Sequence, residues 1–355
     1  MDSLHARNST IVRSENEVSM LEDASLDRSG DRSAAATADA EAAWLARDWR
    51  YRLLRAGMAA LSRMAPRRAV ALFDRIWFTP PRTRPGPDGR RWLARGRRLD
   101  VRLHGLPLRA WSWGHGPAVL LVHGWGGNAG QMRAIGQRLV ERGLRVVAFD
   151  APAHGGSGPS RLGRRVSMVE IAQALRVVAA AAGPLAGVVA HSGGCAATAL
   201  ALRDGWAGPE RIVFVAPFAQ PSMAIGPFGR AIGASAAVTA AFSDLVQRRF
   251  GRPWTDFDVP GLPRLRELPP LLLVHDRDDR EVPWAHAQAV AETWPGARLA
   301  TVHGLGHRRL LRDEAVLARL TGFLAPAPAA RPCPALARDE LDEAFESGGL
   351  APMRC

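Results

Sequence analysis

A serine between small residues, at the junction of an apolar segment and a helix-forming segment, is the most informative feature of this chain. The apolar residues 185–189 lead into AHSGG at 190–194, and an alanine-rich helix is expected to begin at once. A strand-to-helix turn this sharp strains the backbone of its serine and leaves room only for small residues two positions before and after it. Ala190 and Gly194 satisfy that requirement. Ser192 is therefore a candidate nucleophile, although a serine that caps a helix would show a similar local pattern.

A serine hydroxyl is a poor nucleophile at neutral pH, so it needs a base and donors for the charge that develops on a carbonyl oxygen. A glycine-rich loop at 123–128 follows an apolar strand expected at 117–122, and its backbone N–H groups can turn inward. Further on, a strand expected at 269–275 is followed by an aspartate-rich loop with Asp279, and His307 follows the last expected strand. Serine, aspartate and histidine, each after the carboxyl end of a strand, form one of three common orders for serine hydrolases.

These motifs, taken in this order, resemble the α/β-hydrolase family over residues 98–324. Four further segments carry the resemblance beside the serine turn: the oxyanion loop at 123–126, the structural loop at 149–157, the acid loop at 275–283 and the histidine loop at Gly306-His307. Ala190 stands where many members of the family have glycine, and alanine is small enough to fit there.

The resemblance implies a catalytic triad of Ser192, Asp279 and His307, with the backbone N–H groups of Trp125 and Gly193 as the oxyanion hole. His307 would take the serine proton during attack and deliver it to the leaving group, while Asp279 fixes the imidazole tautomer. Water would then release the acyl group from Ser192. This chemistry uses neither a metal ion nor an organic cofactor.

Several neighbouring titratable residues leave alternatives open. Asp276 and Asp278 compete with Asp279 for the acid position, because a register error of one or three residues exchanges them. His303 and His307 stand four residues apart, as metal ligands on a helix do, but the glycines between them favour a loop over a metal site.

Four other polar residues near these motifs have structural interpretations. His123 and His191 adjoin the oxyanion donors and are expected to orient loops. Asp150 follows a strand, but its loop resembles a structural turn. Cys195 lies in the helix after the serine and is expected to pack in the core.

The elements that must position these residues follow from hydrophobic patterning. Helices are expected at 40–62 and 66–78, a linker at 80–89, and an antiparallel hairpin from 100–104 and 108–113. Buried strands then alternate with helices; they are marked by Leu121, Val146, Val188, Val213, Leu272 and Thr301. Such alternation predicts a fold of the α/β class, with a mostly parallel sheet covered by helices on both faces.

The alternation is interrupted once, by an apolar-rich segment at 217–268. The resemblance implies that this segment is a short helical cap inserted after the sixth strand. Its apolar side chains either both pack the cap down and line an acyl or alkyl pocket, or only seal the cap to the body. We expect four parts in the chain: a disordered tail at 1–40, a basic helical arm and linker at 41–97, the hydrolase domain at 98–325, and a Pro/Ala-rich and acidic tail at 326–355.

The net charge of +13 invites a nucleic-acid partner, but its distribution argues against one. All 47 basic residues are arginine, and residues 46–98 hold 15 of them against 3 aspartates, which leaves +1 for the rest of the chain. The aromatic residues of that segment follow helical core spacing rather than a stacking array, so no nucleic-acid binding is expected. Contact of the basic arm with an anionic membrane surface or an acidic partner is a less favoured alternative.

Cysteine usage and the amino-terminal residues bear on the compartment. Three cysteines without a CxxC pair argue against a disulfide framework and for a reducing environment. Residues 1–40 contain no apolar run of the length that a signal peptide or a membrane span needs. We therefore expect a cytoplasmic protein.

These observations favour hydrolysis of a carboxylic ester or thioester with a small to medium, largely apolar acyl group. An acyltransferase or a carbon–carbon bond hydrolase on the same triad are alternatives, as is a non-catalytic binding protein of the same fold. A serine at the turn, where epoxide hydrolases and haloalkane dehalogenases have aspartate, argues against those two activities. The lone tyrosine, Tyr51, lies in the arm, so the paired cap tyrosines of epoxide hydrolases are missing as well.

Overall fold

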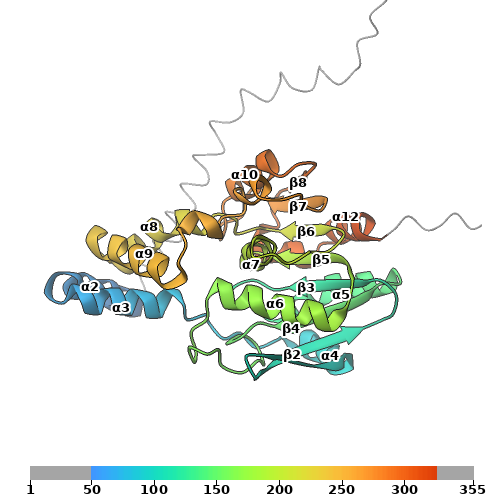
Figure 1. Ribbon diagram of the computed structural model, residues 1–355, viewed down its shortest axis with the longest axis horizontal. Helices are drawn as coiled ribbons and strands as arrows, with labels where there is room; N and C mark the ends of the chain where they lie inside the picture. The colour runs from blue at the N-terminus through green and yellow to red at the C-terminus, as the bar shows by residue number, and fades with distance from the viewer. Residues whose placement is uncertain (1–48, 326–355) are drawn as a thin grey trace, which may run out of the picture. The chain divides into compact units, whose positions relative to one another are not determined.

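The computed structural model describes residues 49–325. Its core is one sheet of eight strands in the order β1-β2-β4-β3-β5-β6-β7-β8 (Figure 1). The strands are β1 (Arg97–Leu103), β2 (Leu106–Trp113), β3 (Ala118–Val122), β4 (Arg145–Asp150), β5 (Leu185–His191), β6 (Ile212–Val215), β7 (Leu271–Asp276) and β8 (Arg298–Val302). The predicted tails at 1–40 and 326–355 lie outside the described residues, as does the start of the helix expected at 40–62.

The sheet is parallel from β4 to β8 and antiparallel only at its β1–β2–β4 edge. Strands β3, β6 and β7 are buried at every position, because helices cover both of their faces. Parallel strands end at the same edge, so the loops after β3, β5, β7 and β8 all open on one side of the sheet. Those loops carry the candidate site residues.

Two hydrophobic clusters fill the two faces of the sheet. Helices α6 (Met168–Ala182), α7 (Gly193–Arg203) and α10 (Ala285–Thr293) contribute to the cluster on one face. Helices α4 (Pro87–Arg95), α5 (Arg133–Glu141) and α12 (Glu314–Leu324) contribute to the cluster on the other. The expected α/β architecture with helices on both faces is therefore present.

Helix α4 is a departure from the expected linker at 80–89. It begins at Pro87, with the extended Gly86 as its N-cap, and so includes the last three residues of that segment. Proline is favoured at the first position of a helix, where its missing N–H would have no partner, so the same residue that suggests a turn also starts this helix. Trp92 anchors α4, because its ring stacks on Trp113 at a centroid distance of 3.8 Å.

The interruption after β6 forms the expected helical cap. It consists of α8 (Pro221–Ile232), α9 (Ala236–Phe250) and the short 3-10 helices η3 (Trp254–Phe257) and η4 (Leu262–Arg264). The other helical segments are α2 (Trp49–Met64), α3 (Pro66–Trp77), η2 (Ala129–Met132), α11 (Gly306–Arg309) and η5 (Leu310–Arg312).

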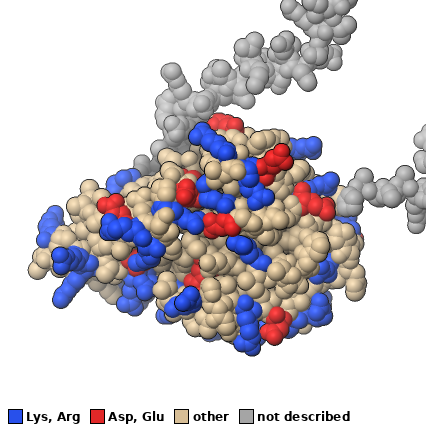
Figure 2. Space-filling model, in the orientation of Figure 1, with Lys and Arg blue, Asp and Glu red and all other residues tan. Residues whose placement is uncertain are grey.

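The helix α3, which sequence patterning assigns to the basic arm, packs on the cap. Phe73 of α3 is fully buried and stacks on Phe242 of α9 with ring centroids 4.1 Å apart. The surface of α2 and α3 is basic, as Figure 2 shows by the arginine side chains over these helices. Among residues 53–77 of α2 and α3, the exposed arginines are Arg55, Arg63, Arg67, Arg68 and Arg75.

Candidate active site

Ser192 sits at the sharp turn between β5 and α7. Its backbone has φ 51° and ψ −123°, a region that non-glycine residues rarely occupy. The turn is crowded, because a Cβ added to Gly124 would meet the Ser192 Cβ at 2.9 Å. A Cβ on Gly194 would meet the carbonyl oxygen of His123 at 2.7 Å. Glycine is thus required at both positions, because a side chain there would collide with Ser192 or with the residues at the end of β3.

His307 and Asp279 are hydrogen-bonded to one another. His307 Nδ1 lies 2.7 Å from Asp279 Oδ2, and both side chains are buried. The other carboxylate oxygen of Asp279 accepts hydrogen bonds from the backbone N–H groups of Glu281 and Val282, at 2.8 and 3.0 Å. Hydrogen bonds to both oxygens therefore fix the orientation of the carboxylate, with Oδ2 directed at the imidazole.

The two rival aspartates of this loop have other partners. Asp276 Oδ2 accepts hydrogen bonds from the backbone N–H groups of Leu305 and of Gly306, the latter at 2.8 Å. Asp278 Oδ2 accepts one from Gly304 N–H at 3.1 Å. Both carboxylates thus tie the acid loop to the histidine loop, and the structure leaves Asp279 as the one of the three that contacts the imidazole.

The backbone N–H groups of Trp125 and Gly193 lie beside each other at the turn. A Cβ built on Gly193 would be 3.4 Å from the Trp125 nitrogen. Within residues 49–325, neither N–H donates a hydrogen bond to a protein acceptor. Two adjacent, unused donors next to Ser192 have the arrangement that an oxyanion hole needs.

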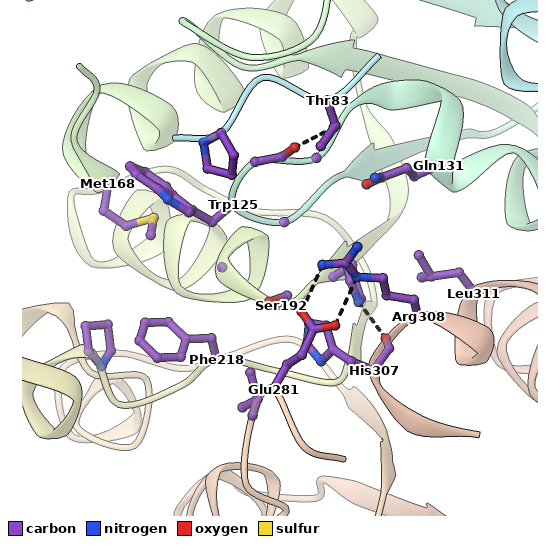
Figure 3. A pocket seen from close by; sticks show the side chains of 18 of the residues that line it. Thr83, Trp125, Gln131, Met168, Ser192, Phe218, Glu281, His307, Arg308 and Leu311 are labelled. Carbon is purple, nitrogen blue, oxygen red and sulfur yellow. Dashed lines mark hydrogen bonds and ion pairs between the residues drawn. The ribbon is translucent and has the colours of Figure 1, made fainter. Parts of the chain in front are cut away.

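A pocket of about 810 Å³ opens above these groups (Figure 3). Ser192, Gly193, Trp125 and His307 all line it. Its apolar walls include Trp77, Phe78, Met168, Phe218, Phe228, Val246, Phe250, Trp254 and Phe257. The pocket is large enough for a drug-sized ligand and largely apolar, as small-molecule sites usually are.

The apolar side chains of the cap divide between the pocket wall and the packing of the cap, so the alternative in which they only seal the cap to the body is wrong. Phe218, Phe228 and Phe250 line the pocket. Val238 and Phe242 are buried in the packing between the cap and the rest of the chain, away from the pocket. The cap therefore both forms the pocket and seals itself to its neighbours.

The polar part of the pocket wall includes an ion pair next to His307. Arg308 Nε lies 3.0 Å from Glu281 Oε1, and Nη2 lies 3.1 Å from Oε2 (Figure 3). Both residues line the pocket and are solvent-exposed. This polar, solvent-exposed end of the pocket contrasts with the aromatic end under the cap.

A sequence model of the alpha/beta hydrolase family matches residues 119–320 of this chain. The chain belongs to the α/β-hydrolase family. No match is found among curated proteins.

Solved structures of α/β hydrolases superpose on the chain. An esterase of Pyrococcus furiosus, Pf2001, has a TM-score of 0.52 and 21% identity over 69% of this chain and 98% of its own. A membrane phospholipase A, described as a bacterial virulence factor, has a TM-score of 0.51 and 17% identity over 77% of this chain and 95% of its own. Est816, described as an N-acyl homoserine lactone degrading enzyme, has a TM-score of 0.50 and 18% identity over 63% of this chain and 100% of its own. At these identities the likeness concerns the fold.

The hydrogen-bond donors around Asp279 keep its carboxylate ionised. Burial works to raise the pKa of Asp279, but hydrogen bonds from His275 and His307 and from backbone N–H groups outweigh it and hold the pKa well below its usual range. His275 was not singled out by sequence reasoning. Its Nε2 lies 3.4 Å from Asp279 Oδ2 and 3.0 Å from the Val282 carbonyl oxygen. The sequence feature that points to His275 is its place at the carboxyl end of β7, directly before the acid loop.

Two buried histidines position the oxyanion loop and the histidine loop. His123 Nε2 accepts a hydrogen bond from Ala151 N–H at 3.0 Å, so its Nδ1 carries the proton and donates to the Gly124 carbonyl oxygen at 2.8 Å. His191 Nε2 donates to the carbonyl oxygen of His307 at 3.0 Å. Burial lowers the pKa of His123 to about 4 and that of His191 to about 3, so both are neutral at neutral pH.

Asp150 has the structural position that its loop suggests. Its Oδ1 accepts from Ala129 N–H and its Oδ2 from Gly156 N–H, both at 2.7 Å. Burial raises its pKa above the ordinary aspartate value. Cys195 is fully buried in α7 and packs in the core, and burial raises its pKa well above that of a free thiol.

Two further observations concern metals and membranes. Within residues 49–325, no group of three or more His, Cys, Asp or Glu side chains is arranged to hold a metal ion. In the same part of the chain, no helix has the length and apolar character needed to span a bilayer.

Proposed function

We propose that the protein is a serine hydrolase that cleaves a carboxylic ester or thioester of a small to medium, largely apolar acyl group, through an acyl-enzyme on Ser192. One observation carries this proposal. His307, which lines the same pocket as the strained Ser192, has its Nδ1 hydrogen-bonded to Asp279 Oδ2 at 2.7 Å. A carboxylate, an imidazole and a hydroxyl arranged in one site are the parts of an activated serine nucleophile.

The first half of the reaction forms the acyl-enzyme. Ser192 Oγ attacks the carbonyl carbon of the substrate, and His307 Nε2 takes the hydroxyl proton. The resulting imidazolium is stabilised by Asp279, which the donors around it keep ionised. His307 then gives the proton to the leaving alcohol or thiol as the bond to the acyl carbon breaks. The leaving group departs and the acyl group stays on Ser192.

The second half repeats these steps with water. His307 takes a proton from the attacking water molecule, the tetrahedral intermediate collapses, and Ser192 Oγ regains the proton as the carboxylic acid is released. In both halves the N–H groups of Trp125 and Gly193 receive the negative oxygen. Loss of one such donor typically costs about 3 kcal/mol of barrier. Their lack of protein acceptors within the described residues supports this role.

Labelling with a fluorophosphonate probe tests the proposal, because this reagent reacts with activated serines. We expect the purified protein to be labelled on the peptide that contains Ser192, as read by mass spectrometry. Ser192→Ala should lose all labelling and all hydrolysis of para-nitrophenyl esters while its Tm stays within about 2 °C of the wild type. Ser243→Ala is the matched control, because this serine lies in cap helix α9 and does not line the pocket. It should be labelled like the wild type.

Two outcomes would contradict the proposal. The first is a folded wild-type protein that neither reacts with the probe nor hydrolyses any ester. The second is a Ser192→Ala variant that retains wild-type turnover. The first result would favour a non-catalytic binding protein of the same fold, and the second would mean that another residue is the nucleophile.

A further inference from the structure

A buried carboxylate in helix α3 binds two arginines from distant parts of the chain. The side chain of Asp74 is only 6% exposed. Its Oδ1 accepts a hydrogen bond from Arg249 Nη1 at 2.7 Å, and its Oδ2 accepts one from Arg165 Nη1 at 2.8 Å. These arginines are 175 and 91 positions away in the sequence. The three residues are called the Asp74 clasp below.

On the cap side, the clasp lies directly behind the apolar wall of the pocket. Trp77 and Phe78, which line the pocket, come one helical turn after Asp74. Arg249 is followed by Phe250, which also lines the pocket, and its guanidinium lies 5.5 Å from the centre of the Phe78 ring. The ion pair between Asp74 and Arg249 therefore joins α3 to α9 beside the residues of both helices that line the pocket.

On the other side, the clasp holds the segment between β4 and α6. Arg165 is followed by Val166, whose N–H donates to the Phe78 carbonyl oxygen at 2.8 Å. Met168, two positions further on, lines the pocket. Three chain segments that form the apolar end of the pocket thus meet at one carboxylate.

Because one carboxylate joins them, the relative positions of the three segments are sensitive to the loss of its charge. A carboxylate with two bound guanidiniums has a defined geometry, whereas apolar side chains can repack around a change in volume. Removal of the carboxylate leaves two arginines facing each other with no anion between them, which favours separation of the segments. The arginines are about one-third exposed, with side-chain accessibilities of 37% and 32%, so each can turn toward solvent when released.

We propose that Asp74 is a specificity-determining positioning residue that, through Arg165 and Arg249, fixes the width of the subsite for the apolar acyl group. The proposal rests on the proposed hydrolase function and adds to it that the aromatic end receives the acyl chain. It also gives the amino-terminal helix α3 a place in substrate selection. Asp74 does not line the pocket, so its effect passes through the walls that it ties together.

The test compares two para-nitrophenyl esters that share a leaving group and differ in acyl length, the acetate and the decanoate. Asp74→Asn keeps the shape of the side chain and removes its charge. We expect kcat/KM for the decanoate to fall about tenfold, through a higher KM, because contacts with methylene groups are lost. The acetate does not reach the aromatic end, and its kcat should change less than about twofold.

Asp204→Asn is the matched control. Asp204 also pairs with an arginine of the same region, Arg252, at 2.9 Å, but neither residue lines the pocket. This variant should keep the wild-type preference between the two esters. If instead Asp74→Asn lowers kcat for both esters equally, or leaves the decanoate KM unchanged, the clasp does not determine specificity.

Two additions keep the test decisive. If Asp74→Asn folds poorly, Arg249→Gln breaks only the cap side of the clasp, and it should also raise the decanoate KM.

A dansyl-labelled fatty acid, followed by fluorescence, measures occupancy of the apolar end without turnover. Should the wild type hydrolyse neither ester, the proposed function fails. Binding of this probe, weakened about tenfold by Asp74→Asn and not by Asp204→Asn, would still support the clasp, and equal binding would refute it.

Discussion

Replacement of Asp279 by asparagine is the sharpest probe of the site, because the structure gives each side-chain oxygen a separate task. One oxygen accepts the backbone N–H groups of Glu281 and Val282, and the other faces His307 Nδ1 at 2.7 Å. Asparagine has the same shape, and its carbonyl oxygen can still accept the two backbone donors. Its NH₂ group must then face His307, where a proton acceptor is needed in place of a donor.

The expected effect follows from this reversal. His307 Nδ1 can accept from the amide only if its proton moves to Nε2, and an imidazole protonated at Nε2 is no longer a base toward Ser192. The corresponding change in a serine protease with a Ser-His-Asp triad lowers kcat by about 10⁴-fold, which is about 5.5 kcal/mol of barrier at about 1.36 kcal/mol per tenfold. Two of the hydrogen bonds to the side chain are retained, so the variant should fold.

The assay is hydrolysis of a para-nitrophenyl ester under saturating substrate, with Tm measured in parallel. Asp278→Asn is the control, because Asp278 is in the same loop, has an exposed side chain and supports Gly304 instead of the imidazole. It should keep at least a third of the wild-type kcat. The reasoning is refuted if Asp279→Asn keeps more than a tenth of wild-type kcat, or if Asp278→Asn loses as much as Asp279→Asn does.

Two further predictions concern stability and the turn. Burial lowers the pKa of His123 and His286 to about 4 and that of His154 and His191 to about 3, so these four stay neutral in the fold while the unfolded chain takes up their protons below about pH 6.5. The free energy of unfolding should therefore fall as pH drops from 6.5 toward 4, as urea melts at several pH values would measure; a flat profile would contradict the assigned neutral histidines. For Gly194→Ala, the added Cβ would approach two carbonyl oxygens within 2.7 and 2.8 Å and displace the oxyanion loop, so we expect about 100-fold lower kcat. Gly322→Ala, on α12 with open space around it, is the control and should leave kcat unchanged.

Local steric and chemical demands made much of the site predictable from sequence. A serine at a strained turn needs small neighbours, so AHSGG predicts such a turn at Ser192, which is the proposed nucleophile. The rule that parallel strands end at one edge of the sheet predicts that the acid loop and the histidine loop lie near Ser192, while the choice of Asp279 and His307 rests on the resemblance to the α/β-hydrolase family. The resemblance to α/β hydrolases implied the cap, at the point where an apolar-rich segment interrupts the alternation of strands and helices.

Other features depend on contacts that no local pattern encodes. Which of the three aspartates of the acid loop contacts the His307 imidazole depends on the neighbouring loops, since Asp276 and Asp278 bind the histidine loop instead. The sequence attached α3 to a separate basic arm, because its arginines dominate the composition of that segment. Its tertiary position makes Trp77 part of the pocket and pairs Asp74 with arginines 91 and 175 residues away. The steric requirements of a turn involve residues adjacent in the sequence, so the sequence alone predicts them. A wall assembled from three segments exists only once the sheet has brought those segments together.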